Sequence, residues 1–302
     1  QDIMLKQPDM IITIDSPGFC FRVVKKLRKQ GLKSKFVHYV APTVWAYKPE
    51  RAGKCKKLFD HLLLLLPFEK PYFDEVGLPC TFVGHPVVCE TKTGDGAAFR
   101  AKYEISDRTT LFCLLPGSRT SEIDRHMPIF TRAVAMLATL YPSITLVLAV
   151  PEYAMNHLFP YLNTSPFRII IAENEEDKRN AMAASQFAFV KSGTVALEAA
   201  MANVPMLVTY KVNSLSAWWL RRMITTKYAN LINILLGKEI IPELLQENSS
   251  PITLASCAST MLRYKEMSYK QKEAINQALK LLLPESDELP SDIAATKILS
   301  LL

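Results

Sequence analysis

Residues 187–210 read FAFVKSGTVALEAAMANVPMLVTY, and this stretch decides the fold class. Residues 187–190 and 206–210 are short apolar runs of strand length, and residues 194–202 between them have the composition of a helix. A strand, a helix and a second strand in this order are typical of a parallel βαβ unit, whose strands are covered by helices. The sequence therefore predicts an α/β fold around this stretch.

The same alternation extends from this unit toward the N-terminus in two series. Residues 90–96, ETKTGDG, separate the series and read as a linker, because they are polar and contain two glycines. We therefore predict two Rossmann-like, doubly wound domains with a cleft between them, residues 1–90 and 91–284, with a helix over 285–302 as a candidate to complete the first. Beyond residue 210 the chain reads as mostly helical. The other predicted strands cover residues 10–15, 35–40, 61–66, 80–83, 111–115, 144–150 and 167–172.

The start of the chain departs from the usual doubly wound pattern. Residues 10–15, MIITID, predict a buried parallel strand that ends at Asp15. Such domains open with a strand and a Gly-rich turn, whereas the first glycine here is Gly18. We therefore expect the chain to begin partway through its first domain, which would be incomplete.

Composition excludes several classes of protein. With 49% hydrophobic and 22% charged residues in 302, the chain can bury a sizeable core, and no apolar run approaches the roughly 20 residues of a membrane span. The six cysteines form no C-x-x-C pair and no metal-ligand pattern with histidine, which predicts reduced thiols in the cytosol and no metal site. The net charge of +7 suits nucleic acid, anionic lipid or phosphorylated substrates without choosing among them.

Residues 115–119, LPGSR, follow directly after a predicted strand and lead into a helix. Gly117 would let the backbone approach a ligand closely, Ser118 and free N–H groups could bind oxygen anions, and Arg119 could chelate phosphate. The carboxyl end of a parallel strand is also where such sheets bind ligands. Taken alone, the motif fits an ordinary strand–helix turn equally well.

Residues 191–194, KSGT, form a second turn of this kind. Ser192, Gly193 and Thr194 could offer N–H groups and hydroxyls to a diphosphate, and Glu198 could accept hydrogen bonds from a ribose diol. The alternative is a simple helix cap followed by a surface glutamate. Two such turns without G-x-x-x-x-G-K-[ST] or G-x-G-x-x-G favour a nucleotide-sugar site over an ATP or NAD site.

Three further polar positions carry weaker predictions. Asn233 lies in a loop-like stretch, KYANLIN, where its amide could contact a base or diphosphate or could simply cap a helix. Asp9 and Asp15 flank the first strand, and Asp15, at the carboxyl end, is the better candidate for a general base. Structural hydrogen bonding is the alternative role for both carboxylates.

Residues 214–224, SLSAWWLRRMI, combine aromatic, apolar and basic side chains. That composition is typical of a helix at a membrane interface, and a core helix with a basic tip explains it equally well. The residues predicted to contact lipid are Trp218, Trp219, Leu220, Arg221 and Arg222.

Read together, the motifs resemble the lipid-A-disaccharide synthase family of GT-B glycosyltransferases. The resemblance runs in order over most of the chain. It rests on IDSPGF (14–19), VAPTVWAY (40–47), LPFE (66–69), VGHP (83–86), LPGSR (115–119), SGTVALE (192–198) and NILLGKEIIPELLQE (233–247).

The resemblance implies transfer of 2,3-diacylglucosamine from UDP-2,3-diacylglucosamine to 2,3-diacylglucosamine 1-phosphate, with inversion and without a metal or other cofactor. It implies work at the anionic cytoplasmic face of the inner membrane rather than on nucleic acid, and it is compatible with a homodimer. The UDP-binding positions carry over to Arg119, Ser192, Gly193, Thr194, Glu198 and Asn233, and the acidic ones to Asp9 and Asp15.

Two positions depart from the family pattern. Many members have Asp where this chain has Gly18 and Asn where it has Cys20, which leaves the identity of the general base open. Other UDP-sugar GT-B enzymes, such as the transferase of the lipid II precursor or an epimerase, share only the S-G-x-x-x-x-E helix. A non-catalytic lipid-binding fragment is the alternative from a different class.

Overall fold

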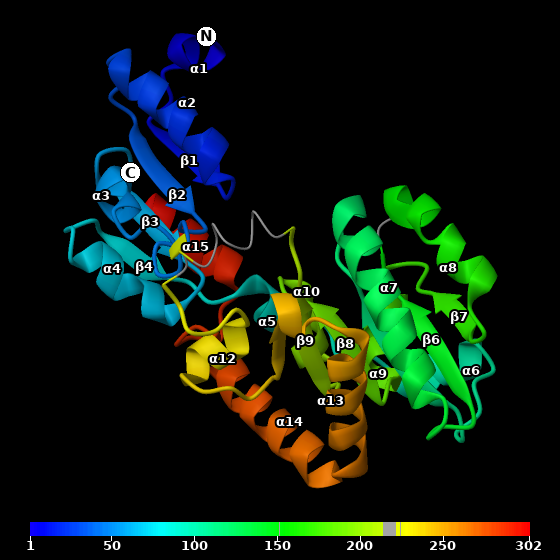
Figure 1. Ribbon diagram of the computed structural model, residues 1–302. Helices are drawn as coiled ribbons and strands as arrows, with labels where there is room; N and C mark the ends of the chain where they lie inside the picture. Colours follow the sequence, from blue (N-terminus) through cyan, green and yellow to red (C-terminus); the bar gives the residue numbers. More distant parts are fainter. Residues whose placement is uncertain (151, 214–221, 224) are drawn as a thin grey trace. The chain divides into compact units, whose positions relative to one another are not determined.

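The computed structural model covers residues 1–302 and describes all of them except residues 151, 214–221 and 224 (Figure 1). Across the described residues, no helix combines the length and the apolar character needed to cross a bilayer. The chain divides into two compact units, each built on its own parallel sheet. Unit 1 contains Gln1–Glu90, Arg222–Thr226 and Lys280–Leu302, and unit 2 contains Thr91–Arg221 and Lys227–Leu279.

Unit 1 has four parallel strands in the order β1-β2-β3-β4. Phe36 and Leu64 are fully buried in its core, which confirms the predicted α/β class for this part of the chain. The strands are β1 (Met10–Ile14), β2 (Lys35–Tyr39), β3 (His61–Leu64) and β4 (Cys80–Phe82). The helices are α1 (Asp2–Lys6), α2 (Pro17–Lys29), α3 (Arg51–Lys56), η1 (Pro67–Glu69), α4 (Lys70–Asp74), α5 (Pro86–Glu90) and α15 (Pro290–Leu299).

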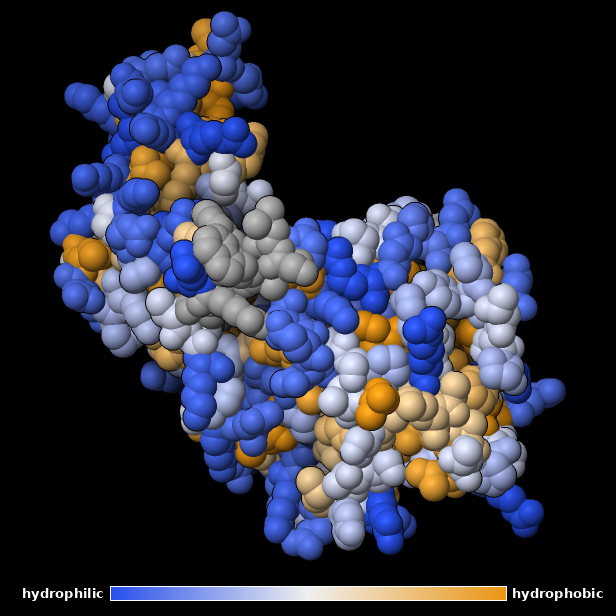
Figure 2. All heavy atoms as spheres, in the orientation of Figure 1, coloured by the Kyte–Doolittle hydropathy of each residue, from blue (hydrophilic) through white to orange (hydrophobic). Residues whose placement is uncertain are grey.

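Helix α2 is amphipathic. Val24 and Leu27 are buried against the sheet, while Arg22, Lys25 and Lys29 are exposed on the opposite face. Figure 2 shows this N-terminal part of unit 1 as a largely hydrophilic surface. The helix therefore attaches to unit 1 through its apolar stripe and presents its cations to solvent.

Strand β1 differs from its prediction as a buried strand. It pairs in parallel with β2, as expected, and among the described residues no strand lies on its other side. Ile12 and Ile14 are therefore 46% and 64% exposed. An apolar sequence alone does not distinguish a central strand from an edge strand, because both carry β-branched residues.

Unit 2 has six parallel strands in the order β10-β9-β8-β5-β6-β7. The strands are β5 (Thr110–Leu115), β6 (Ile144–Leu148), β7 (Arg168–Ile171), β8 (Phe187–Lys191), β9 (Met206–Tyr210) and β10 (Glu243–Leu245). The helices are α6 (Gly96–Lys102), α7 (Thr120–Leu137), η2 (Glu152–His157), α8 (Phe159–Thr164), α9 (Glu175–Ala184), α10 (Val195–Met201), α12 (Leu231–Leu236), η3 (Gln246–Asn248), α13 (Pro251–Arg263) and α14 (Lys265–Lys280).

Strand β10 was missed by the sequence reading, which assigned helix to most of the chain after residue 210. It has only three residues, and its place in the sheet comes from parallel pairing with β9, where Glu243 lies opposite Val208. Such a short strand has no periodicity of its own, so only the tertiary fold specifies it.

The order of the strands places β5 and β8 side by side at a topological switch point. From β5 the chain continues outward through β6 and β7, and it then returns to the other side of β5 with β8. Parallel α/β sheets bind ligands outside the carboxyl ends of the strands at such a point. The turns that follow β5 and β8 therefore lie together where a ligand is expected.

Gly94, which precedes α6, and Gly96, its first residue, are packing residues. A Cβ atom at Gly94 would lie 2.2 Å from the carbonyl oxygen of Arg179, and one at Gly96 would lie 2.8 Å from that of Ala183. Both partners belong to α9, and Asn180 of the same helix accepts a 2.7 Å hydrogen bond from the Asp95 N–H. This segment, which reads as a linker in sequence, is thus seated closely on α9.

Candidate functional site

A cavity of 720 Å³ lies at the carboxyl ends of β5, β6, β7 and β8 in unit 2. It includes most of the residues predicted to bind UDP, although Ser192 and Asn233 are not part of its lining. The lining residues are Leu115, Gly117, Ser118, Arg119, Glu122, Ala149, Val150, Ala172, Glu173, Asn174, Glu175, Lys178, Lys191, Gly193, Thr194, Val195 and Glu198.

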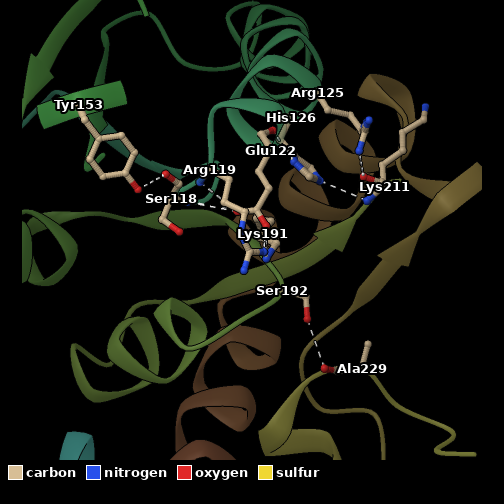
Figure 3. Close-up of polar contacts among 10 residues, drawn as sticks. All are labelled: Ser118, Arg119, Glu122, Arg125, His126, Tyr153, Lys191, Ser192, Lys211 and Ala229. Carbon is tan, nitrogen blue, oxygen red and sulfur yellow. Dashed lines mark hydrogen bonds and ion pairs between the residues drawn. The ribbon is translucent and has the colours of Figure 1, made fainter. Parts of the chain in front are cut away.

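The first turn, residues 116–119, folds around a carboxylate of its own chain. Ser118 and Arg119 donate their backbone N–H groups to Glu122 Oε2 at 3.2 and 3.4 Å, and Arg119 Nη1 donates to Glu122 Oε1 at 3.2 Å (Figure 3). Gly117 has a φ of +117°, and a Cβ there would lie 2.4 Å from Glu122 Oε2. The prediction that these N–H groups are free for an anion is therefore wrong for Ser118 and Arg119.

Glu122 also connects the first turn to strand β8. Lys191 Nζ lies 3.0 Å from Glu122 Oε1, and both side chains are largely buried, at 14% and 11% exposed. Burial alone would raise the pKa of Glu122, but the hydrogen bond and charge of Lys191 and the donors of Arg119 outweigh it and lower the pKa. Glu122 was missed from the sequence, because the N-cap three residues before it is Arg119, which lacks the side-chain acceptor that a capping-box signature requires.

His126 extends this network to strand β9. Its Nδ1 donates to the Glu122 carbonyl oxygen at 2.8 Å, and its Nε2 accepts from the Lys211 N–H at 3.2 Å (Figure 3). One nitrogen donates and the other accepts, so the ring is neutral. Burial lowers the pKa of His126, which favours that form. The first turn of α7 is thereby fixed to the end of β9.

The second turn, residues 191–194, differs from the first because two of its backbone N–H groups have no acceptor among the described residues. Ser192 donates its N–H to the Thr209 carbonyl oxygen at 2.9 Å and its hydroxyl to the Ala229 carbonyl oxygen at 3.2 Å. Within the described part of the chain, the N–H groups of Gly193 and Thr194 have no acceptor, and both residues are exposed. These two N–H groups remain available to a bound anion.

Glu198 lies one turn into α10 and lines the same cavity. Its Oε2 is 2.7 Å from Lys178 Nζ, which also pairs with Glu175 Oε2 at 2.5 Å. Burial would lower the pKa of Lys178, but the two carboxylates outweigh it and raise the pKa. Lys178 thus orients the Glu198 carboxylate at the cavity wall.

Asn233 is fully buried and is used within the fold. Its Nδ2 donates to the Ile241 carbonyl oxygen and to Glu243 Oε1, both at 2.8 Å, and its Oδ1 accepts from the N–H groups of Ile240 and Ile241. This set uses the bonding capacity of the amide. In this structure Asn233 supports the loop before β10 and does not reach the cavity.

Asp9 and Asp15 lie at opposite ends of β1 in unit 1. At about 3.3 Å per residue the strand separates them by roughly 20 Å, so they do not share one site. Asp15 and the following Ser16 both have positive φ values, +49° and +45°, and both are exposed. Two consecutive non-glycine residues in this region mark a strained turn, a feature that clusters at functional sites.

A second feature of unit 1 joins two of the quoted motifs. Trp45 of VAPTVWAY donates its indole N–H to Oε1 of Glu69 in LPFE at 3.1 Å, and the Leu66 N–H donates to Glu69 Oε2 at 3.2 Å. Glu69 is 2% exposed, and burial raises its pKa to about 7. This carboxyl group fixes the loop after β2 to the end of β3.

The predicted lipid-contact segment falls almost entirely outside the described residues. Trp218, Trp219, Leu220 and Arg221 belong to the undescribed range, while Arg222 is described and exposed.

Comparison with known proteins assigns the chain to a family. The sequence pattern of the lipid-A-disaccharide synthetase family matches residues 1–297. The chain belongs to this family. The lipid-A-disaccharide synthase of Rhodospirillum centenum is 40% identical over 99% of this chain and 75% of its own length, and that of Gluconobacter oxydans is 41% identical over 100% and 72%. The expected family and its glycosyltransferase class are confirmed.

Solved structures confirm the GT-B fold class. The S. aureus MnaA–UDP co-structure has a TM-score of 0.65 at 15% identity and covers 100% of this chain and 79% of its own. UDP-GlcNAc 2-epimerase from Neisseria meningitidis, bound to UDP-GlcNAc, has a TM-score of 0.61 at 13% identity over 99% and 78%. This lipid-A-disaccharide synthase family member therefore shares its fold with sugar-nucleotide enzymes.

Proposed function

We propose that the protein transfers 2,3-diacylglucosamine from UDP-2,3-diacylglucosamine to 2,3-diacylglucosamine 1-phosphate. The products are the β-1,6-linked disaccharide 1-phosphate and UDP. Membership of the lipid-A-disaccharide synthase family supports the reaction. The observation that carries the donor side is the cavity at the β5–β8 switch point, where an arginine and two open N–H groups face the same space.

The donor diphosphate is proposed to bind between the two turns. The Arg119 side chain is 78% exposed, and its guanidinium group can form charge-assisted hydrogen bonds with phosphate oxygens. The N–H groups of Gly193 and Thr194 supply neutral donors, and Glu198 accepts hydrogen bonds from the ribose diol. Ser192 is kept in the proposal through its place in the turn, although its hydroxyl is bonded to Ala229.

Catalysis follows from the charges that change during transfer. Negative charge develops on the UDP leaving group as the glycosidic bond breaks, and Arg119 with the open N–H groups can stabilise it without a metal. We assign Asp15 as the general base that takes the proton of the acceptor 6-hydroxyl group. Direct displacement by that oxygen inverts the anomeric centre.

The substrates also suggest where the protein works. Both carry acyl chains, so we propose peripheral contact with the anionic inner face of the inner membrane through the segment around Trp218. The aromatic side chains of this segment suit the lipid interface, and its basic side chains and the net charge of +7 suit an anionic bilayer surface.

The decisive experiment measures UDP release with both diacylated substrates and identifies the disaccharide by mass spectrometry. Asp15→Asn should lower kcat by about 10²- to 10⁴-fold, as for a lost general base. Asp74→Asn, which removes a surface carboxylate of the same unit, is the matched control and should stay within twofold.

Other outcomes would redirect the assignment. Loss of activity in Asp9→Asn but not in Asp15→Asn would move the base to the other end of β1. Conversion of UDP-N-acetylglucosamine without any acceptor would indicate an epimerase. Failure of the diacylated pair to react, with UDP still bound, would contradict the proposed reaction.

A further inference from the structure

The proposed function leaves one cation of the cavity without a role. Of the three basic side chains in its lining, Arg119 faces solvent and Lys178 is held between Glu175 and Glu198. Lys191 is different, because it is largely buried and, among the residues that the structure describes, has a single carboxylate partner, Glu122. A buried ammonium group between the two turns of a proposed ligand site is a candidate for a functional role.

The position of the Lys191 ammonium group is closely defined. Nζ lies 3.0 Å from Glu122 Oε1 on the side of the first turn and 5.2 Å from the ring centroid of Tyr210. On the other side it lies only 3.5 Å from where a Cβ of Gly193 would be, so it sits against the open part of the second turn. Figure 3 shows the lysine between the two turns, beside Arg119 and Glu122.

The charges of this group do not cancel. Glu122 carries one negative charge and accepts hydrogen bonds from two cations, Lys191 and Arg119, as well as from two backbone N–H groups. Four donors saturate the acceptor sites of one carboxylate. These three side chains together therefore carry a net charge of +1, and the Lys191 end of the group lies beside Gly193, whereas Glu175 and Glu198 of the same lining share the single cation Lys178.

We propose that Lys191 supplies a second cation to the diphosphate of the donor, and that Glu122 is the positioning residue that holds this ammonium group at the second turn. The inference rests on the proposed UDP-sugar site and adds to it a contact that the family resemblance does not assign. In this arrangement Arg119 approaches the diphosphate from the turn before α7 and Lys191 approaches it from the end of β8, and Glu122 contacts both.

The competing explanation is purely structural. Glu122 would then only cap α7, and Lys191 would only neutralise it. The two explanations differ in what happens to UDP when each residue is changed, because a structural pair supports the fold and makes no contact with phosphate.

The first experiment measures UDP binding by isothermal titration calorimetry. Lys191→Met should weaken UDP binding about 10- to 100-fold, as for the loss of a hydrogen bond to a charged group. Binding of uridine, which lacks the phosphates, should change less than twofold, and Lys191→Arg should recover most of the UDP affinity. Lys211→Met, which removes a cation outside the cavity lining, should alter UDP affinity less than twofold.

The second experiment is a double-mutant cycle on UDP affinity. Glu122→Gln keeps an acceptor for the backbone N–H groups but removes the charge that holds Lys191. It should weaken UDP binding about three- to tenfold in the natural protein and less than twofold in the Lys191→Met background. That dependence is expected only if Glu122 acts through Lys191.

Specific results would overturn the inference. Unchanged UDP affinity in Lys191→Met would remove the phosphate contact. The same effect of Glu122→Gln in both backgrounds would reduce Glu122 to a helix cap, and tighter binding would make it a competitor of the diphosphate. If the natural protein itself does not bind UDP, the proposed function fails first, and the two failures are thereby distinguished.

Discussion

The two turns of unit 2 follow neighbouring strands of one sheet and look alike in sequence, yet they differ in structure. In the first turn, the N–H groups of Ser118 and Arg119 are satisfied by Glu122. In the second, those of Gly193 and Thr194 remain open in the part of the chain that is described. The difference teaches that a phosphate-type turn can serve as a rigid support for charged side chains, while its neighbour offers the backbone to the ligand.

The first prediction carries the largest expected effect and concerns the glycines of the turns. Gly117→Ala should lower the free energy of unfolding by about 2–4 kcal/mol, because the new Cβ meets Glu122 and the backbone is strained. Gly193→Ala should cost less, about 1–2 kcal/mol, because its Cβ meets no atom closer than 3.5 Å and only the backbone strain at a φ of +155° remains. Urea unfolding of the two variants makes the comparison, and equal losses would show that the turns are equally constrained.

The second prediction separates support from binding at the first turn. Arg119→Ala should weaken UDP binding by about 1.5–3 kcal/mol, because a charge-assisted hydrogen bond to phosphate is lost. Arg125→Ala is the matched control, since this arginine lies on α7, directly after the turn that holds Arg119, but donates to the Lys211 carbonyl oxygen outside the cavity lining. Calorimetry with UDP measures both, and equal losses would locate the diphosphate elsewhere.

The third prediction uses pH to weaken the contact that His126 makes with the first turn. The pKa of His126 is lowered by burial and by the nearby charges of Lys191 and Arg125, against the opposing influence of Glu122. The neutral ring therefore stabilises the fold fully above about pH 6.5, and this contribution is lost as the pH falls toward the lowered pKa. Between pH 7.5 and 5.5, His126→Gln should lose about 1 kcal/mol less stability than the natural protein, because it has no imidazole that takes up a proton on unfolding.

The comparison with His126→Gln is needed because unit 1 also titrates in this range. Burial lowers the pKa of His38 and of His61 to about 4. The contribution of each neutral ring to the stability of the fold is therefore lost as the pH falls below 6.5. Glu69, with its pKa raised to about 7, acts in the opposite direction, because its buried carboxyl group stabilises the fold more as the pH falls from above 7 and the group becomes neutral. These contributions are common to both proteins, and identical pH profiles would show that His126 does not couple the first turn to protonation.

The fourth prediction is the smallest and concerns the second turn. Ser192→Ala should weaken UDP binding by about 0.5 kcal/mol at most, because the hydroxyl is already bonded to the Ala229 carbonyl oxygen. The measurement is the same calorimetric titration as for Arg119→Ala. If Ser192→Ala weakened UDP binding as much as Arg119→Ala, the hydroxyl would bond to the ligand and not to Ala229. Both turns would then bind UDP through a side chain.

The sequence predicts the local parts of this site and not their connections. Strand, turn and helix at residues 115–119 and 191–194 follow from hydrophobic pattern and turn chemistry. The pattern does not predict that β5 and β8 are neighbours, because the order of strands in a sheet depends on packing across the whole unit. The pair of Lys191 with Glu122 exists only because of that order, so it could not be predicted.

Asn233 illustrates the reverse case. Its amide suits a nucleotide as well as it suits a loop, and the sequence does not choose between these roles. The choice is made by β10, a three-residue strand that brings Glu243 within 2.8 Å of Asn233. Because that strand has no signal of its own, the burial of Asn233 could not be anticipated, whereas the position of Asp15 at the end of β1 could.

The close seating of Gly94 and Gly96 on α9 has a practical consequence for dissecting the chain. A fragment of unit 2 that starts at α6 would look complete by secondary structure, yet it would lack residues that pack on the helix bearing Lys178. Exposing that helix face would loosen the partner of Glu198. Fragments intended for ligand binding should therefore retain the chain from Thr91 onward, and spacers or affinity tags belong upstream of that residue.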